Sequence, residues 1–163
     1  MRKMVLLIIL TLIGSTKMVH ANSVEKSDCD ANKKEIEEFI GSSDGVLLGS
    51  FTGKAFSPEN SGVSGAFFQI EKLWGIKTKT PIIIISMDKS SEFRKADDIW
   101  RQIKDELEKK DSILTNKKFL AFAYEPVNFG KHQIVGTLYC GGIREVKPEE
   151  ENIIVKKIEV HFK

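Results

Sequence analysis

Few residues in this sequence are suited to catalysis by a side chain. Beyond residue 21 the chain contains two cysteines, Cys29 and Cys140, and two histidines, His132 and His161. Such a set could supply a thiol nucleophile activated by an imidazole. His132 and Cys140 are the nearest pair, yet eight residues of one continuous strand would separate them by ~26 Å. The spacing excludes this pairing unless the strand is broken.

Other catalytic and cofactor-binding patterns are missing from the sequence. It contains no HExxH, GxSxG or CxxC motif and no glycine-rich phosphate loop. The clustered acids Asp97-Asp98 and Glu149-Glu150-Glu151 fall in segments that we expect to be solvated helix or tail. We therefore expect no enzymatic activity, no metal ion and no cofactor.

Aromatic side chains are the other candidates for ligand contact. Trp74 and Trp100 could stack on a sugar or a base, but each falls on an apolar stripe, which favours packing in the core. Phe67 lies on the strand face opposite Phe68, beside Gln69. It is either an exposed aromatic on a binding face or covered by the terminal strand, and the sequence leaves both open.

The chain length and the first residues indicate the class of protein and its compartment. The chain has 163 residues, 41% hydrophobic and 29% charged, which is typical of one globular domain. It begins with two basic residues, an apolar run over residues 5–14 and a polar stretch that ends at Ala21. This pattern predicts a signal peptide over residues 1–21, cleaved before Asn22, with an uncleaved anchor as the alternative. We therefore expect residues 22–163 to form a single exported domain, secreted or periplasmic/extracellular.

Net charge argues against a polyanionic partner. Removing the three basic residues of the first 21 from the 25 in the chain leaves 22, against 23 acidic side chains, a formal charge of −1. A near-neutral domain has no excess field that attracts phosphate backbones or anionic lipid. We expect no nucleic-acid partner and no stable membrane anchor after signal cleavage.

Export also bears on the two cysteines. An oxidising compartment favours a disulfide between Cys29 and Cys140, with unpaired thiols or an intermolecular bridge as the alternatives. In the chain-entropy description, so long a loop would contribute up to ~4–5 kcal/mol of stability.

Hydrophobic periodicity predicts the order of the elements. Alternation over residues 66–74 indicates a strand with one core face, and the stripe of Ile99, Trp100 and Ile103 indicates an amphipathic helix. Loops are expected at residues 55–65 and 125–131. The expected elements are a helix at 31–40 ended by Gly41, strands at 45–54, 66–74 and 82–85, a helix at 92–110, strands at 118–125 and 132–140, and a sixth strand at 154–162.

This order predicts a mostly β fold with helices. A helix between the third and fourth of five antiparallel strands is the element order of the OB-fold, a partly open Greek-key barrel. We expect a five-stranded OB-fold-like barrel with an extra N-terminal helix and an extra C-terminal strand. Trp100 and Ile103 would plug it. The alternative is a generic α+β sandwich.

Short segments of the sequence resemble one known family. They are SDGVLLG at 43–49, FQIEKLWG at 68–75, KFLAFAY at 118–124 and YCGG at 139–142. In this order, over about residues 29–146, they are similar to the netrin-like OB-fold domains related to tissue inhibitors of metalloproteinases. That family ends its second strand with Trp-Lys-Gly, whereas this chain has Trp74-Gly75.

The resemblance implies a disulfide at the places of Cys29 and Cys140, and it implies binding to a protease. In the family's inhibitors, a cysteine at the first position chelates the zinc of the protease through its α-amine and carbonyl oxygen. Cleavage before Asn22 would leave seven residues ahead of Cys29, whose nitrogen would then be an amide. The family's second early cysteine is replaced by Ala31.

We therefore expect an exported protein-binding domain that resembles these inhibitors without using zinc chelation. Its partner would be a protein, such as an extracellular or envelope protease. The alternative is a structural or envelope-assembly domain without a discrete ligand.

The OB-fold expectation also predicts where a partner would bind. OB-folds commonly bind through the face of strands two and three and the loops joining strands one to two and four to five. Here the loops contain Phe56, Asn60 and Phe129, and the second strand contributes Phe67. We predict that these four residues line one partner-binding surface. The alternative is that the loop phenylalanines cap a barrel end.

Overall fold

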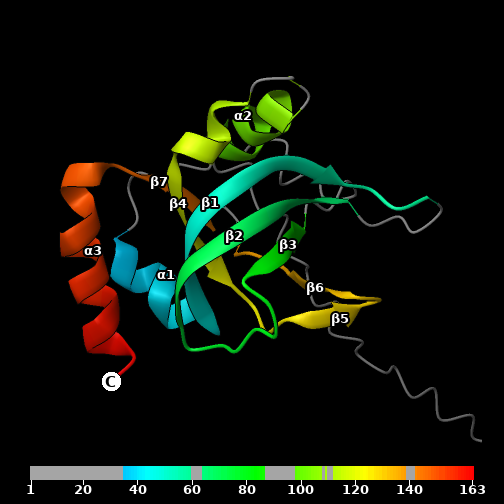
Figure 1. The fold of residues 1–163 in the computed structure, drawn as a ribbon. Helices are drawn as coiled ribbons and strands as arrows, with labels where there is room; N and C mark the ends of the chain where they lie inside the picture. The colour runs from blue at the N-terminus through cyan, green and yellow to red at the C-terminus, as the bar shows by residue number, and fades with distance from the viewer. Residues whose placement is uncertain (1–34, 60–63, 87–97, 108, 110–111, 139–141) are drawn as a thin grey trace, which may run out of the picture.

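The structure is a computed structural model that describes residues 35–59, 64–86, 98–107, 109, 112–138 and 142–163. The predicted signal peptide, Cys29, Asn60, Cys140 and the predicted starts of the first two helices lie outside these residues. Figure 1 shows the elements, which are α1 (Ile36–Ser42), β1 (Gly45–Phe56), β2 (Gly65–Trp74), β3 (Ile82–Ser86), α2 (Asp98–Leu107), the 3-10 turn η2 (Ile113–Asn116), β4 (Lys118–Ala123), β5 (Val127–Phe129), β6 (His132–Val135), β7 (Ile143–Val146) and α3 (Pro148–His161).

Seven strands form one open, mostly antiparallel sheet, and three helices flank it. Their order across the sheet is β5-β6-β3-β2-β1-β4-β7, with β3 and β6 parallel. No closed barrel is detected among the residues described. The end of β4 nevertheless meets the segment after β6, because Ala123 forms a bridge with Thr137 and the Leu138 amide donates to the Phe122 carbonyl at 2.9 Å.

Strand β1 explains why the sheet has two apolar faces. Its buried residues do not simply alternate with polar ones, since Val46, Leu47 and Leu48 are all buried. Leu47 belongs to one core and its two neighbours to another, because successive side chains of a strand point to opposite faces. A continuous apolar run is therefore what a strand covered on both faces requires.

The face of the sheet that packs against α2 and η2, which we call the inner face, carries the larger core. Phe51 contacts the rings of Phe68 and Phe119 edge to face, with both pairs of ring centroids 5.1 Å apart. Ile103 of α2 and Leu114 of η2 are buried in the same cluster. Burial of Ile103 agrees with its predicted packing in the core, and the plugging of a barrel stays a prediction because no closed barrel is detected in the described residues. The side chain of Trp100 lies outside the description.

The opposite face, which we call the outer face, is covered by α1 and α3 over part of its area. Phe39 of α1 stacks on Phe122 of β4, with ring centroids 5.1 Å apart, and Ile158 of α3 is fully buried in the same cluster. Lys157 also pairs with Glu37 at 2.9 Å, which links the two helices. We call this part of the outer face, over β1, β4 and β7, the helix-covered half (Figure 1).

The predicted sixth strand is wrong, because residues 148–161 form the helix α3. The apolar residues of this segment suit both periods: Ile154 and Ile158 are two strand repeats apart and also one helical turn apart. Pro148 in the first turn and the acids Glu149 to Glu151 after it are the signals that favour a helix start. The sequence therefore carried the correct signal upstream of the ambiguous stripe.

A bulge changes which residues of β2 face the inner core. Leu48 pairs with Lys72 whereas Gly49 pairs with Ile70, so Glu71 is an extra residue on β2. The predicted stripe placed Ile70 and Trp74 on one face. The extra residue reverses the alternation beyond it: Leu73 packs with the inner core, and Trp74 packs against the helix-covered half.

Several predicted boundaries are also corrected. The first helix runs through Gly41 to Ser42, and β1 extends to Phe56, beyond the predicted loop start. The predicted loop 125–131 contains β5 and the tight turn at Gly130, whose φ is +58°. The predicted strand 132–140 is shorter, since β6 ends at Val135. Ile82, the first residue of the predicted strand 82–85, is 41% exposed. No helix within the described ranges is long and apolar enough to cross a membrane.

Candidate functional site

Four rings pack together where the end of β1 meets the β5–β6 hairpin. Phe56 is at the centre: its ring centroid lies 5.6 Å from that of Phe67, 6.0 Å from Phe129 and 5.7 Å from His132, all edge to face. Phe67 and His132 also meet at 5.4 Å. Edge-to-face contact at these distances is the arrangement that aromatic pairs prefer. We call these four residues the outer aromatic cluster.

Strand register explains why these distant residues meet. Phe67 pairs with Ile84 between β2 and β3, and Ile84 pairs with Ile134 between β3 and β6. His132, two residues before Ile134, pairs with Phe129 of β5. Paired residues share one face of a sheet, so all of them point to the same side. Ile84 is fully buried there, although it belongs to neither large core.

The cluster lies on the same sheet face as α1 and α3. Leu48 and Ser50 share one face of β1, Ser50 pairs with Gln69, and Gln69 shares a face with Phe67. This side of the sheet thus has two parts. We call the second part, over β3, β6 and β5 with the rings of Phe56 and Phe67, the ring-covered half.

Three of the four predicted binding residues are brought together. Phe56, Phe67 and Phe129 contact one another through Phe56, and Asn60 lies outside the described residues. Phe67 is half-buried, with its ring against those of Phe56 and His132, and the described residues contain no terminal strand that could cover it. Neither phenylalanine of the predicted loops is among the residues of the inner core.

His132 is the member of the cluster that the sequence did not reveal. The sequence suggests its imidazole only as a partner for the Cys140 thiol, and it excludes that pairing on the assumption of one continuous strand. Because β6 ends at Val135, that assumption is wrong, and Cys140 itself lies outside the description. The other histidine, His161, ends α3 instead of lying on a strand, and its ring contacts Phe162 at 5.1 Å.

Strand β5 lies at one edge of the sheet beside the cluster, and no other described strand pairs with it on that side. All three of its residues are exposed, including Val127 at 67% and Phe129 at 36%. On the opposite side of the hairpin, the Lys79 ammonium donates to the Asn128 side-chain oxygen at 3.2 Å, and the Lys79 amide donates to the Gln133 side chain. The edge is therefore apolar on one face and polar on the other.

The hairpin and the strand beside it carry only basic charged side chains, although Glu125 directly precedes Pro126 and the Glu125 amide donates to the Asp44 carboxylate at 2.9 Å. Residues 75–86 and 126–138 contain Lys77, Lys79 and Lys131 and no aspartate or glutamate. All of these residues are described, and they include β3, β5, β6 and the loop before β3. The hairpin and its neighbour thus present a basic border to an apolar surface.

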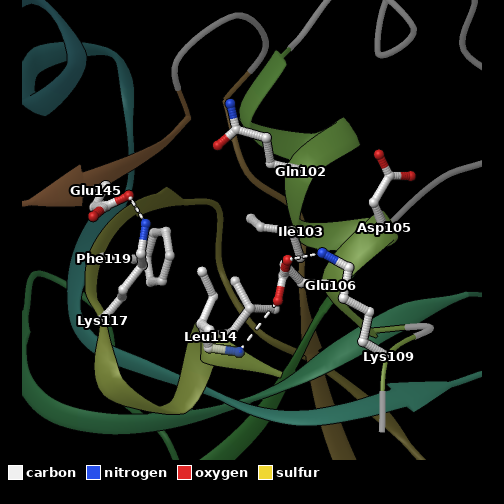
Figure 2. Close-up of a pocket in the computed structure, with 10 residues that line it drawn as sticks. Gln102, Ile103, Asp105, Glu106, Lys109, Leu114, Lys117, Phe119 and Glu145 are labelled. Carbon is white, nitrogen blue, oxygen red and sulfur yellow. Dashed lines mark hydrogen bonds and ion pairs between the residues drawn. The ribbon is translucent and has the colours of Figure 1, made fainter. Parts of the chain in front are cut away.

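A hollow of about 200 Å³ lies on the other side of the sheet, between α2, η2 and β7 (Figure 2). The Glu106 carboxylate accepts hydrogen bonds from the Lys109 ammonium and, at 3.2 Å, from the Ile113 amide. These two donors hold the pKa of Glu106 below its ordinary 4.5, Lys109 having the larger effect. Lys117 pairs with Glu145 at 2.9 Å. These four charges satisfy one another, and the volume is small for a ligand site.

A second group of charges ties α3 to the sheet. The Lys118 ammonium lies 2.8 Å from Glu71, the extra residue of the bulge, and 3.2 Å from Glu151 of α3. Hydrogen bonds to Glu71 and then to Glu151 raise the pKa of Lys118 above its ordinary 10.5. This group stabilises the helix position and leaves no charge without a partner.

Of the three places, the outer aromatic cluster is the one beside exposed apolar side chains of an edge strand, Val127 and Phe129. No group of three or more histidine, cysteine, aspartate or glutamate side chains suited to a metal ion is found in the described part of the chain. No protein-family model matches the sequence, and neither a curated protein nor a solved structure is found to match it.

Proposed function

We propose that this chain is an exported protein-binding domain that binds its partner through the ring-covered half of the sheet. The observation that carries the proposal is the outer aromatic cluster. Three phenylalanines and a histidine from β1, β2, β5 and β6 meet on the outer face, beside exposed Val127 and Ile82. Aromatic rings bury a large area at low cost in side-chain entropy, so they are common anchors of protein interfaces.

The finer fold that we propose is OB-like. Three features support it: the antiparallel run β1, β2, β3, the parallel pair β3 and β6, and the antiparallel pair β1 and β4. The contacts of Ala123 with Thr137 and of Phe122 with Leu138 would bring the two arms of the sheet together, as a partly open Greek-key barrel requires. In that arrangement the cluster lies on the face and loops that OB-folds use for binding.

The resemblance to metalloproteinase inhibitors suggests the class of partner, an extracellular or envelope protease. The zinc-chelating mechanism is not part of the proposal, because seven residues would precede Cys29 after cleavage at Asn22. Determining the N-terminus of the exported protein tests this step. A start at Asn22 keeps the nitrogen of Cys29 as an amide, and a start at Cys29 would restore the zinc mechanism.

A capture experiment with matched variants tests the binding surface. The mature, oxidised protein is immobilised, exposed to its native extracellular or envelope fraction, and the retained proteins are identified by mass spectrometry. Val127→Ser and Val160→Ser form a matched pair, since the two valines are 67% and 71% exposed, on β5 and on α3. We expect Val127→Ser to weaken capture about tenfold, a loss of about 1.4 kcal/mol, and Val160→Ser to leave it unchanged.

Two outcomes would contradict the proposal. If both valine variants retain the same partner equally well, the partner binds elsewhere on the domain. If the wild-type protein retains no protein specifically, the alternative of a structural or envelope-assembly domain is favoured. Circular dichroism of each variant separates loss of binding from loss of folding.

A further inference from the structure

We propose that the partner binds as an added β-strand on the edge of β5, through a segment in which apolar and acidic residues alternate. The inference rests on the proposed function and names the chemistry of its partner. Two independent observations carry it, the edge of β5 that no other described strand pairs and the lysines around the β5–β6 hairpin.

The first observation concerns the backbone of β5. Phe129 and His132 are paired on either side of the turn at Gly130 and Lys131. In a hairpin with a two-residue turn, the residues that flank the turn exchange both of their backbone hydrogen bonds, and the next pair exchanges none. The next residue, Asn128, therefore directs its N–H and C=O away from β6, toward the edge where no described strand pairs. Those two groups can accept an added strand.

The second observation concerns the two faces of that edge. Val127 and Phe129 point to the face of the outer aromatic cluster, whereas Asn128 points to the face where Lys79 lies. An added strand also alternates, so its residues on the first face would be apolar and those on the second face would lie near an ammonium group. Lys79 and Lys131, with no acid in residues 126–138, complement acidic side chains there.

The length of the edge limits what it binds. Strand β5 has three residues, and Pro126 precedes it, so only one pair of outward backbone groups is offered. A short edge next to proline and lysine resists pairing with further copies of itself. Recognition then depends on side chains that flank the single backbone contact, which favours one short partner segment over extended sheet growth.

Synthetic peptides test the inference directly. The probe is a fluorescein-labelled peptide of alternating valine and glutamate, and its counterpart has lysine in place of glutamate. We expect the glutamate peptide to bind the full mature domain at least about tenfold more tightly than the lysine peptide, as measured by fluorescence anisotropy. Lys79→Gln should reduce this preference, whereas Lys156→Gln on α3 should leave it unchanged.

Backbone methylation tests the added strand itself. Methylating one peptide nitrogen at a time blocks the hydrogen bonds of the peptide singly. We expect one nitrogen near the centre to be sensitive, by at least about tenfold in affinity, and its two neighbours in sequence to be insensitive, because alternate amides of a strand point to opposite sides. The amide of Asn128 should also become protected from hydrogen exchange.

The outcomes separate this inference from the proposed function. Equal loss at all nitrogens, or an unprotected Asn128 amide, would overturn the added strand. If Val127→Ser still reduces capture of the natural partner in that case, the proposed function stands and the partner lies on the rings. Failure of both the peptide and the capture experiments would overturn both.

Discussion

The outer face of the sheet has two halves, and different parts of the chain cover them. Its helix-covered half is sealed by α1 and α3, with Phe39 stacked on Phe122 and Ile158 fully buried. Its ring-covered half has four rings in mutual contact and leaves Val127 and Phe129 exposed at the edge. The same two strands, β1 and β2, contribute to both. The difference indicates that buried packing is concentrated in the first half and exposed apolar surface in the second.

The largest expected effect is in the helix-covered half. Phe122→Ala removes a fully buried ring that stacks on Phe39, so we expect a loss of about 3–5 kcal/mol in the free energy of unfolding. Urea denaturation followed by circular dichroism measures it. A loss below about 1 kcal/mol would place Phe122 outside a packed core and remove the contrast between the halves.

A smaller effect is expected at the centre of the ring-covered half. Phe56 is half-buried and contacts three rings, so Phe56→Ala should cost about 1–2 kcal/mol, with the β5–β6 hairpin affected most. Hydrogen exchange at β5 and β6 localises the change. A cost equal to that of Phe122→Ala would mean that the rings form a core in their own right.

The regularity of burial decides which elements can be predicted from the sequence. Alternation predicts β2, apolar runs predict β1, β3 and β4, and the helical stripe predicts α2, because each of these segments has a clear apolar pattern. The sequence does not predict β5 because three exposed residues give no pattern, and it predicts a strand in place of α3 because Ile154 and Ile158 fit both periods. Local signals therefore succeed where burial is regular.

The candidate site was predictable only in part, for a related reason. Phe56 and Phe129 were placed at one surface by analogy with OB-fold loops, and the structure brings them to 6.0 Å. Their contact with His132 depends on the parallel pairing of β3 with β6, which no periodicity in the sequence specifies. Pairing between distant strands is a property of the whole chain.

The charges that hold α3 should have an effect smaller than either ring. Lys118 is 39% exposed with Glu71 and Glu151 around it, so Lys118→Met should cost at most about 1 kcal/mol and less in high salt. Because the folded pKa of Lys118 is raised above 10.5, this stabilisation is complete below 10.5 and is lost as pH rises through the folded value. Thermal melts in alkaline buffers should therefore fall less steeply in the variant. An identical alkaline slope would show that the pairs are not formed in solution.

The smallest effect concerns Glu37, which pairs with Lys157 between α1 and α3. Hydrogen bonding to Lys157 lowers the pKa of Glu37 below 4.5, so its stabilisation is present above 4.5 and is lost as pH falls through the lower folded value. Melting of Glu37→Gln should depend less on acid than melting of the wild type, with Glu159→Gln as the control on α3. Equal acid dependence of wild type and Glu37→Gln would remove this link from the helix-covered half.

Because of the bulge at Glu71, deleting a residue from β2 has a different effect from substituting one. Gly49 lies opposite it, and a Cβ at that position would collide with the carbonyl oxygen of Gln69, so the irregularity needs glycine on the facing strand. Deleting Glu71 would restore regular alternation and exchange Leu73 with Trp74 between the two walls of the domain. A substitution at position 71 alters one ion pair, whereas deletion of the same residue moves the side chains that follow it to the opposite faces of the sheet. An insertion or deletion in β2 therefore changes the face that its last side chains occupy, whereas a substitution leaves those faces unchanged.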